Sequence, residues 1–167
     1  MPIHTHTFPS PCGNIILASH NDQLCLCDWY DHPCAQTNLR RLTRHIHEPL
    51  SHEPAPVILQ ARTQLNEYFT HARTTFTIPL LPIGTDFQKH VWNALLNIPY
   101  GETRSYKDIA LTIHNPKGIR AVAQAIGANG LTIFIPCHRV IGSSGSLTGF
   151  AAGLTIKHIL LSLESHP

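Results

Sequence analysis

The segment LTIFIPCHRVIG, residues 131–142, is the most informative stretch of this 167-residue chain. Its apolar first half runs into Pro136, and a proline holds the residue before it, here Ile135, in an extended conformation. Cys137 follows at the point where the chain must turn. A free thiol with a pKa of about 8.5 is only a few per cent ionised at neutral pH, so a reactive cysteine needs a base or a positive charge nearby. The segment therefore makes Cys137 a candidate nucleophile.

Two candidate activators follow the cysteine directly, His138 and Arg139. Side chains of adjacent residues diverge in regular structure, so we expect His138 to act on the thiol through a water or across a tight turn. By the logic of a catalytic triad, a carboxylate should orient the histidine from behind. The C-terminal helix has an apolar stripe of Ile156, Ile159, Leu160 and Leu163. Glu164 lies beside that stripe and is the candidate carboxylate, and a solvated residue at the helix end is the alternative.

The second half of the chain, residues 84–167, is predicted to be mostly helical. Thr85 and Gln88 form a capping box at the start of a helix, which Pro99 and Gly101 end. The apolar face of this helix consists of Phe87, Val91, Ala94, Leu95 and Ile98.

A pair of shorter helices follows. Ser105 and Asp108 predict a second cap, before a short helix with Tyr106, Ile109, Ala110 and Ile113 at helical spacing. Residues 114–118 predict a turn that contains glycine, and residues 119–126 a third helix. Two short helices joined in this way have the form of a helix-turn-helix, although such pairs are common in protein cores.

The third helix has small residues where a reader of the major groove would carry long polar ones. Its predicted buried stripe is Ile119, Val122 and Ile126. Its predicted surface is Arg120, Ala121, Gln124, Ala125 and Ala128. Alanines around one arginine suit a close approach to a narrow DNA groove. They also simply favour a helix, and composition leaves both interpretations open.

The first half, residues 1–83, has a different pattern and predicts a small α/β domain. Residues 14–19 and 24–30 are apolar runs around a turn and predict a hairpin. A polar stretch with prolines occupies residues 31–56, and residues 57–69 have helical spacing.

Composition indicates a globular protein of the cytoplasm. No apolar run approaches the ~20 residues of a membrane span, and the first residues do not form a signal peptide. Five cysteines at irregular spacing fit a disulfide framework poorly. Residues 1–83 hold five basic and six acidic residues, whereas residues 84–167 hold seven and four. A polyanion would therefore bind the second half.

The sequence around Cys137 resembles a known family. Residues 136–140, PCHRV, are similar to the signature of the O6-alkylguanine-DNA alkyltransferases, also called methylated-DNA–protein-cysteine methyltransferases. The resemblance runs from Thr85 to Glu164 and includes IPYGET at 98–103, SY at 105–106, NP at 115–116, RAV at 120–122, Asn129, SSG at 143–145 and GF at 149–150. The first half matches only loosely, through Ser10, Pro11 and Gly13.

The resemblance implies an α/β fold with two parts. Residues 1–83 would form an RNase H-like supporting domain, a three-stranded antiparallel sheet with helices. Residues 84–167 would form a mostly helical DNA-binding and alkyl-acceptor domain with a winged-helix-like helix-turn-helix.

The resemblance also implies DNA repair by direct reversal of damage. Such a protein flips O6-alkylguanine out of duplex DNA and transfers the alkyl group irreversibly to a cysteine, here Cys137, in a single turnover. His138, through a water and held by Glu164, would take the thiol proton. Tyr106 would give a hydrogen bond or a proton to guanine N3, and Asn129 would hold the turn before the reactive segment.

Further residues carry implied binding roles. Arg120 would fill the gap left by the flipped nucleotide, while the helix around Ala121 lies in the minor groove. The other implied DNA contacts are Lys117, Gln124 and Ser143. The implied contacts to the base are Tyr106, Val140 through its carbonyl, Phe150 and Ala151, where some family members carry a serine.

The expected partner is double-stranded DNA carrying O6-alkylguanine, bound by a monomer; activity on O4-alkylthymine and cooperative binding stay open. We expect no cofactor and no metal. Animal members bind zinc in the first domain, but His4, His6, His20 and Cys25 do not match their ligands position by position.

Two other functions compete with this hypothesis. A cysteine hydrolase would use Cys137, His138 and Glu164 but would need an oxyanion hole and an acyl-binding cleft, which no motif indicates. A protein that only recognises alkylated DNA would lack the acceptor cysteine, and Cys137 argues against it.

Overall fold

The computed structural model describes residues 1–145, 149–150 and 152–165. The chain divides into two compact units, Met1–Ile83 and Gly84–Pro167, and each is described by itself. No helix among the described residues has both the length and the apolar character needed to cross a membrane.

The first unit is built on a sheet with the strand order β3-β2-β1-β4. Strands β1 (Ile3–Ser10), β2 (Gly13–His20) and β3 (Gln23–Trp29) are successive antiparallel neighbours. The predicted hairpin is β2–β3. Its loop, Asn21 and Asp22, has positive φ at both residues, as a tight two-residue hairpin turn requires. A short strand, β4 (Leu50–Ser51), adds a fourth, parallel member that the expected three-stranded sheet lacked.

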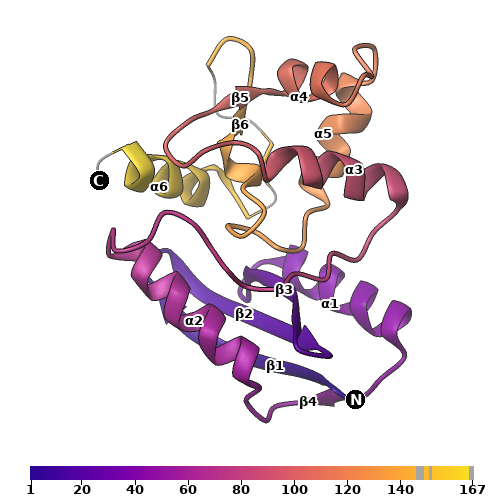
Figure 1. The fold of residues 1–167 in the computed structure, drawn as a ribbon, viewed down its shortest axis with the longest axis vertical. Coiled ribbons are helices and arrows are strands. Elements are labelled where there is room, and N and C mark those ends of the chain that lie inside the picture. Colours follow the sequence, from indigo (N-terminus) through magenta and orange to yellow (C-terminus); the bar gives the residue numbers. More distant parts are fainter. Residues whose placement is uncertain (146–148, 151, 166–167) are drawn as a thin grey trace. The chain divides into compact units, whose positions relative to one another are not determined.

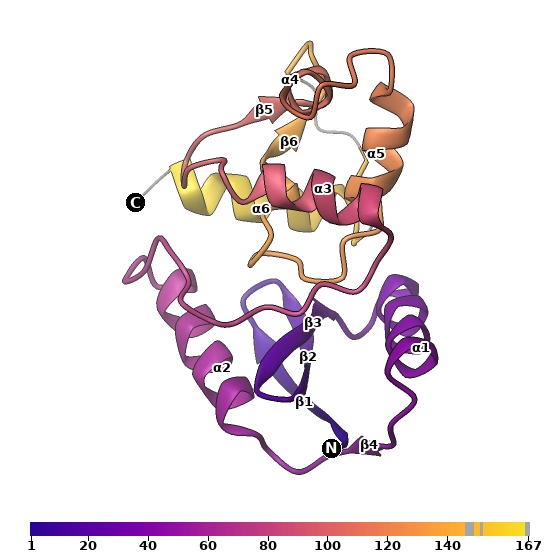
Figure 2. The ribbon, with the colours of Figure 1, turned by 45° about the vertical axis from the view of Figure 1, so that its right-hand side comes forward.

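Helices α1 (Pro33–Ile46) and α2 (Pro56–Phe69) lie on opposite sides of this sheet (Figure 2). Because both faces are covered, the middle of β2 is buried without alternation. Sequence patterning predicted α2 but left α1 inside a polar stretch. Its few apolar residues include Ala35 and Leu42, which pack against Ile3, Ile16, Ala18, Cys25 and Leu26.

The described residues of the second unit form four α-helices and a short two-stranded sheet, which can be followed in Figure 1. Its helices are α3 (Asp86–Leu95), α4 (Tyr106–Thr112), α5 (Ile119–Gly127) and α6 (Leu154–Ser165). Strands β5 (Arg104–Ser105) and β6 (Val140–Ile141) pair in parallel. Both predicted capping boxes are present, at Thr85 and at Ser105.

Helices α4 and α5 form the predicted helix-turn-helix. The turn before α5 requires its glycine, since a Cβ atom at Gly118 would lie 2.3 Å from Asn115 Nδ2. The wing-like part after β6 is only partly described, because residues 146–148 and 151 fall outside the described ranges.

Three predicted side-chain environments are wrong. Phe87 is 36% exposed, because it lies in the first turn of α3, away from the residues this helix buries. In α5, Ile119 is 40% exposed at the start of the helix, and Ala125 is buried instead of lying on the surface. The small Ala125 lets α3 come close enough for Trp92 Nε1 to donate a 2.8 Å hydrogen bond to its carbonyl oxygen.

Candidate active site

Cys137 is the first residue of a short 3-10 helix, η1 (Cys137–Arg139), directly before β6. Its side chain is buried, and its backbone N–H donates a 2.7 Å hydrogen bond to the Ile135 carbonyl. The Val140 N–H donates to the Cys137 carbonyl, which closes the helical turn. Pro136 therefore sets a turn that holds the thiol inside the protein. All five cysteines are free thiols.

The chain before Cys137 is a tightly folded loop held by Asn129. Asn129 Nδ2 donates to the Ile135 carbonyl at 2.9 Å, and its Oδ1 accepts from the Leu131 N–H at 3.0 Å. Asn129 is itself buried, and its two bonds add to the backbone hydrogen bonds within the loop, such as that from the Ile135 N–H to the Leu131 carbonyl at 2.9 Å. Ile133, a β-branched residue, has a φ of +73° within the loop. Such a conformation costs about 1–3 kcal/mol and persists only where the surroundings enforce it.

His138 and Glu164 meet inside the second unit. His138 Nε2 and Glu164 Oε2 are 2.6 Å apart, and both side chains are buried. The burial of Glu164 excludes the alternative of a solvated carboxylate at a helix end. Because the carboxylate can only accept, Nε2 carries the proton, which leaves the lone pair on Nδ1. Nδ1 is buried and has no hydrogen-bond partner among the described residues.

The pKa of His138 is lowered, and burial is the main cause because it disfavours the charged imidazolium. The hydrogen bond and negative charge of Glu164 oppose this shift, whereas the positive charges of Arg139 and Lys157 add to it. His138 is therefore a neutral base at physiological pH.

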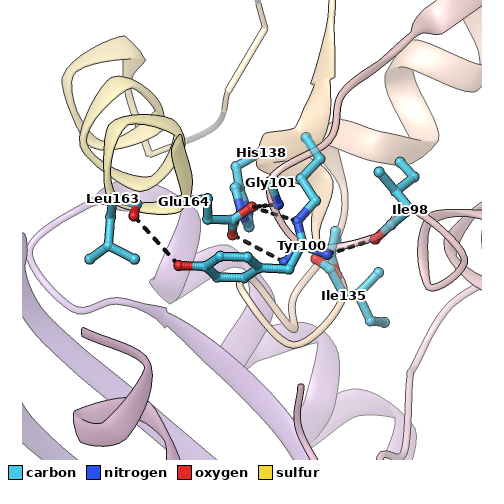
Figure 3. A network of polar contacts seen from close by, with 9 residues as sticks. Ile98, Tyr100, Gly101, Ile135, His138, Leu163 and Glu164 are labelled. Atoms are coloured by element: carbon cyan, nitrogen blue, oxygen red, sulfur yellow. Dashed lines mark hydrogen bonds and ion pairs between the residues drawn. The ribbon is translucent and has the colours of Figure 1, made fainter. Parts of the chain in front are cut away.

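Glu164 is held by more than the histidine, as Figure 3 shows for its labelled partners. Arg139 binds it in a bidentate manner, with Nε at 2.8 Å from Oε1 and Nη2 at 3.1 Å from Oε2. The Gly101 N–H donates to Oε1 at 3.3 Å. Arg139 Nη1 donates to the Ile98 carbonyl at 2.7 Å, and its guanidinium lies over the Tyr100 ring, 5.8 Å from the centroid. Sequence reasoning named Arg139 only as a candidate activator of Cys137 and did not predict its contact with Glu164.

Lys157 is a second buried cation that sequence reasoning missed. Its side chain is fully buried in α6, and Nζ donates a 2.6 Å hydrogen bond to the Val140 carbonyl. Burial lowers the pKa of Lys157, and an electrostatic interaction with Cys137 opposes that shift. The sequence did contain a signal for Lys157: it lies seven residues before Glu164, so the two side chains share one face of the helix.

Tyr106, the first residue of α4, is half-buried next to the Lys157 charge, whose Nζ is 5.9 Å from its ring centroid. Gly149 has a φ of +66°, and a Cβ atom there would lie 2.9 Å from the Tyr106 hydroxyl oxygen. Phe150 is partly buried, and Ala151 lies outside the described residues. Two of the residues predicted to contact the base, Tyr106 and Val140, lie near the Lys157 ammonium group, the first through its ring and the second through its carbonyl.

The predicted DNA contacts are solvent-exposed. Arg120, Ala121 and Gln124 occupy the exposed part of α5, and Lys117 is exposed in the turn before it. Ser143 is exposed on a different element, after β6. One exposed helix surface thus presents one guanidinium group among small side chains.

In the described part of the chain, no group of three or more histidine, cysteine, aspartate or glutamate side chains is arranged to hold a metal ion. Of the four residues compared with the zinc ligands, Cys25 is buried in the core. His4 Nδ1 contacts the Glu53 carbonyl at 3.0 Å. His6 Nε2 accepts a hydrogen bond from Arg62 at 3.0 Å.

Comparisons with known proteins cover both units. Residues 3–82 match the model of the 6-O-methylguanine DNA methyltransferase ribonuclease-like domain. Residues 86–166 match that of the 6-O-methylguanine DNA methyltransferase DNA binding domain. The expected ribonuclease-like fold and DNA-binding domain are thereby confirmed.

Relatives match over nearly their whole length. The constitutive methylated-DNA–protein-cysteine methyltransferase of Bacillus subtilis is 43% identical, over 95% of this chain and 93% of the relative. The Mycobacterium tuberculosis methylated-DNA–protein-cysteine methyltransferase is 46% identical, over 97% of this chain and 92% of its own. A crystal structure of Mycobacterium tuberculosis OGT in complex with DNA superposes with a TM-score of 0.82 at 42% identity, covering 97% of this chain and 92% of that one. The chain therefore belongs to the 6-O-methylguanine DNA methyltransferase family.

Proposed function

We propose that this chain repairs DNA by moving the alkyl group from O6 of a damaged guanine to Cys137, which keeps it. The observation that carries the proposal is the buried His138–Glu164 pair. Its 2.6 Å contact fixes the proton on Nε2 and leaves Nδ1 as a buried base one residue from the thiol. This is the arrangement that activates a cysteine nucleophile.

The transfer is a displacement at the alkyl carbon. The Cys137 sulfur forms a bond to that carbon as the bond from the carbon to guanine O6 breaks. The thiol proton passes to His138 Nδ1 through a bridging water, and Glu164 stabilises the imidazolium that forms. The positive charge of Lys157, which interacts with Cys137, favours the thiolate.

The leaving group is the guanine base. The electron pair of the broken bond stays on O6 and spreads over the purine. The Tyr106 hydroxyl donates a hydrogen bond or a proton to N3, and the nearby Lys157 charge makes Tyr106 a better donor. The second lone pair of the Val140 carbonyl, the first being bound to Lys157, accepts from the exocyclic amine. We also propose contacts to the base from Phe150 and from Ala151, which lies outside the described residues.

Guanine O6 is inaccessible to a thiol in a stacked duplex, so the nucleotide must be flipped out, at a cost of a few kcal/mol. Arg120 fills the gap it leaves, and Ala121 lets α5 approach the minor groove closely. Lys117, Gln124 and Ser143 contact the DNA backbone. Because these contacts are mostly to phosphate, we expect affinity to fall steeply with salt and to depend little on sequence.

The product is a thioether, which the proposed site residues cannot hydrolyse, so each protein molecule reacts once. The second unit, residues 84–167, carries the DNA-binding and acceptor functions, and residues 1–83 support it. We propose that the protein acts as a monomer, without a cofactor. Cys137 must remain reduced, which fits the cytoplasm.

The acceptor is tested with a duplex in which O6-methylguanine carries a radiolabelled methyl group. Label should transfer to the wild type and not to Cys137→Ala. Cys34→Ala, which removes a half-buried thiol of the first unit, should accept label like the wild type. Normal labelling of Cys137→Ala refutes the assignment.

Base flipping is tested by comparing two substrates. Arg120→Ala should slow the repair of duplex DNA much more than the reaction with free O6-benzylguanine, which needs no flipping. Lys89→Ala removes the same charge from an exposed site on α3 and should affect both reactions little. Equal losses on the two substrates for Arg120→Ala would rule out its role.

A further inference from the structure

The proposed reaction uses His138 and Glu164 but leaves Arg139 without a task. Arg139 is 7% exposed, an unusual environment for an arginine. Its Nε and Nη2 take both oxygens of Glu164, and its Nη1 binds the Ile98 carbonyl. A buried charge of this kind is costly unless it is fully paired. Its position on the carboxylate that holds the catalytic base suggests an electrostatic function.

We propose that Arg139 is a positioning residue that keeps His138 neutral, and therefore able to accept the thiol proton, down to mildly acidic pH. The inference rests on the proposed function in that His138 is taken to be the base. Arg139 acts through Glu164 and is not placed in contact with the DNA or the alkyl group.

The first part of the argument is the sharing of Glu164. A buried carboxylate that faces a histidine alone stabilises the imidazolium and converts the pair into an ion pair. Here each Glu164 oxygen already accepts a hydrogen bond from Arg139, and Oε1 also accepts from the Gly101 N–H. These donors compensate most of the negative charge of Glu164, independently of its contact with His138. Glu164 can therefore orient the imidazole without drawing a second proton onto it.

The second part is the set of charges that face His138. Glu164 of α6 favours the imidazolium, whereas Arg139 and Lys157 disfavour it, as does burial. Cys137, which is also ionisable, precedes it in η1. Arg139 is thus one of two cations that hold the base neutral, and it is the one attached to Glu164.

The third part is geometric. Arg139 ties Glu164, near the end of α6, to the turn after α3, through the Ile98 carbonyl and the face of the Tyr100 ring. Tyr100 in turn donates from its hydroxyl to the Leu163 carbonyl at 3.5 Å, as drawn in Figure 3. These contacts fix the orientation of the Glu164 carboxylate, in addition to compensating its negative charge. A lysine at position 139 would keep the charge but not the two parallel hydrogen bonds.

The test measures the rate of reaction with free O6-benzylguanine as a function of pH, which avoids effects on DNA binding. Because burial lowers the pKa of His138, the wild type should lose rate only below pH 6.5. Arg139→Met should move this acid limb upward by about one pH unit, which lowers the rate on the limb about tenfold. Arg139→Lys should move it less. Arg104→Met removes a surface arginine that binds Glu102 at 3.1 Å and should leave the profile unchanged.

A second readout follows the titration of His138 itself by NMR, with His138→Gln identifying the signal. The midpoint should rise in Arg139→Met and, to a smaller extent, in Arg139→Lys. Lower rates with an unmoved acid limb and an unmoved His138 midpoint would overturn the inference and make Arg139 purely structural. If Arg139→Met does not fold, Arg139→Lys decides by the same two measurements. The titration does not need alkyl transfer, so a failure of the proposed function would be seen separately, as a wild type that never reacts.

Discussion

Replacing Asn129 by alanine should destabilise the second unit, because it removes both side-chain hydrogen bonds that hold the loop before Cys137. The amide spans the reactive loop, from the Leu131 N–H to the Ile135 carbonyl. Both groups are in buried residues; alanine leaves the Leu131 N–H unpaired, whereas the Ile135 carbonyl keeps its hydrogen bond from the Cys137 N–H. The unpaired N–H costs about 1–3 kcal/mol and the lost hydrogen bond to the carbonyl about 1 kcal/mol, which predicts a total loss of about 3 kcal/mol. That is a large part of the 5–15 kcal/mol typical of a folded domain.

The assay is urea unfolding followed by the fluorescence of Trp92, in a Trp29→Phe background so that the signal reports on the second unit. With a slope of about 2 kcal/mol per molar urea, the midpoint should fall by about 1.5 M. Asn129→Asp should be no more stable than Asn129→Ala. Its side chain can still accept from the Leu131 N–H, but it places an oxygen instead of an N–H donor against the Ile135 carbonyl. Asn97→Ala, at an exposed asparagine, is the control and should stay within about 0.5 kcal/mol of the wild type.

The alkyl-transfer rate should fall with stability in this variant. Asn129 fixes the carbonyl to which the Cys137 N–H is also bonded, so the loop can no longer hold the thiol in one position. A loss below about 1 kcal/mol for Asn129→Ala would mean that the loop satisfies its polar groups without the amide. The assignment of Asn129 as the residue that holds this turn would then be wrong.

Two further predictions concern Tyr106 and His138. Gly149→Ala should slow alkyl transfer at least tenfold, because its Cβ would meet the Tyr106 hydroxyl oxygen at 2.9 Å; Gly145→Ala has the same sign of φ but open space around it, and should slow the reaction little in a single-turnover assay. The pKa of His138 is lowered by burial, so between that value and about 6.5 the unfolded chain binds a proton that the folded chain does not. The free energy of unfolding should therefore fall as the pH is lowered through this window, and urea titrations of His138→Gln should lack that part of the slope; an equal slope would contradict a lowered pKa.

Local sequence signals predicted much of the second unit. Capping boxes at Thr85 and Ser105 depend only on residues three apart, so they can be recognised without knowledge of the fold. Cys137 and His138 were recognised from their motif. Glu164 was found by requiring a carboxylate behind the histidine. What the sequence left open was whether that carboxylate is buried, and burial depends on how α6 packs.

The features that escaped prediction depend on contacts between distant segments. Arg139 is buried because Glu164 and the Ile98 carbonyl meet it, and both lie more than 20 residues away in the sequence. Helix α1 was missed because its apolar residues are few and gain significance only against β3 and its neighbours. Ala125 was predicted to be on the surface because alanine occurs both on helix surfaces and where helices pack closely, so the sequence does not reveal its contact with α3.

The buried charges give the site its chemical character. Glu164 orients His138, Arg139 compensates Glu164, and Lys157 faces Cys137 from the same helix that carries Glu164. Once the sulfur is alkylated it can no longer carry a negative charge, and Lys157 loses that interaction. The arrangement thus supports the thiolate before transfer and offers no route for removing the alkyl group afterwards.

The most direct test of the central claim is the stoichiometry and position of alkylation. The protein is incubated with an excess of duplex carrying O6-methylguanine, and its intact mass and its peptides are then analysed. The account predicts the mass of one added methyl group per protein molecule, located on Cys137, with no further repair when fresh duplex is added. Repeated turnover, or methylation at any other residue, would contradict it.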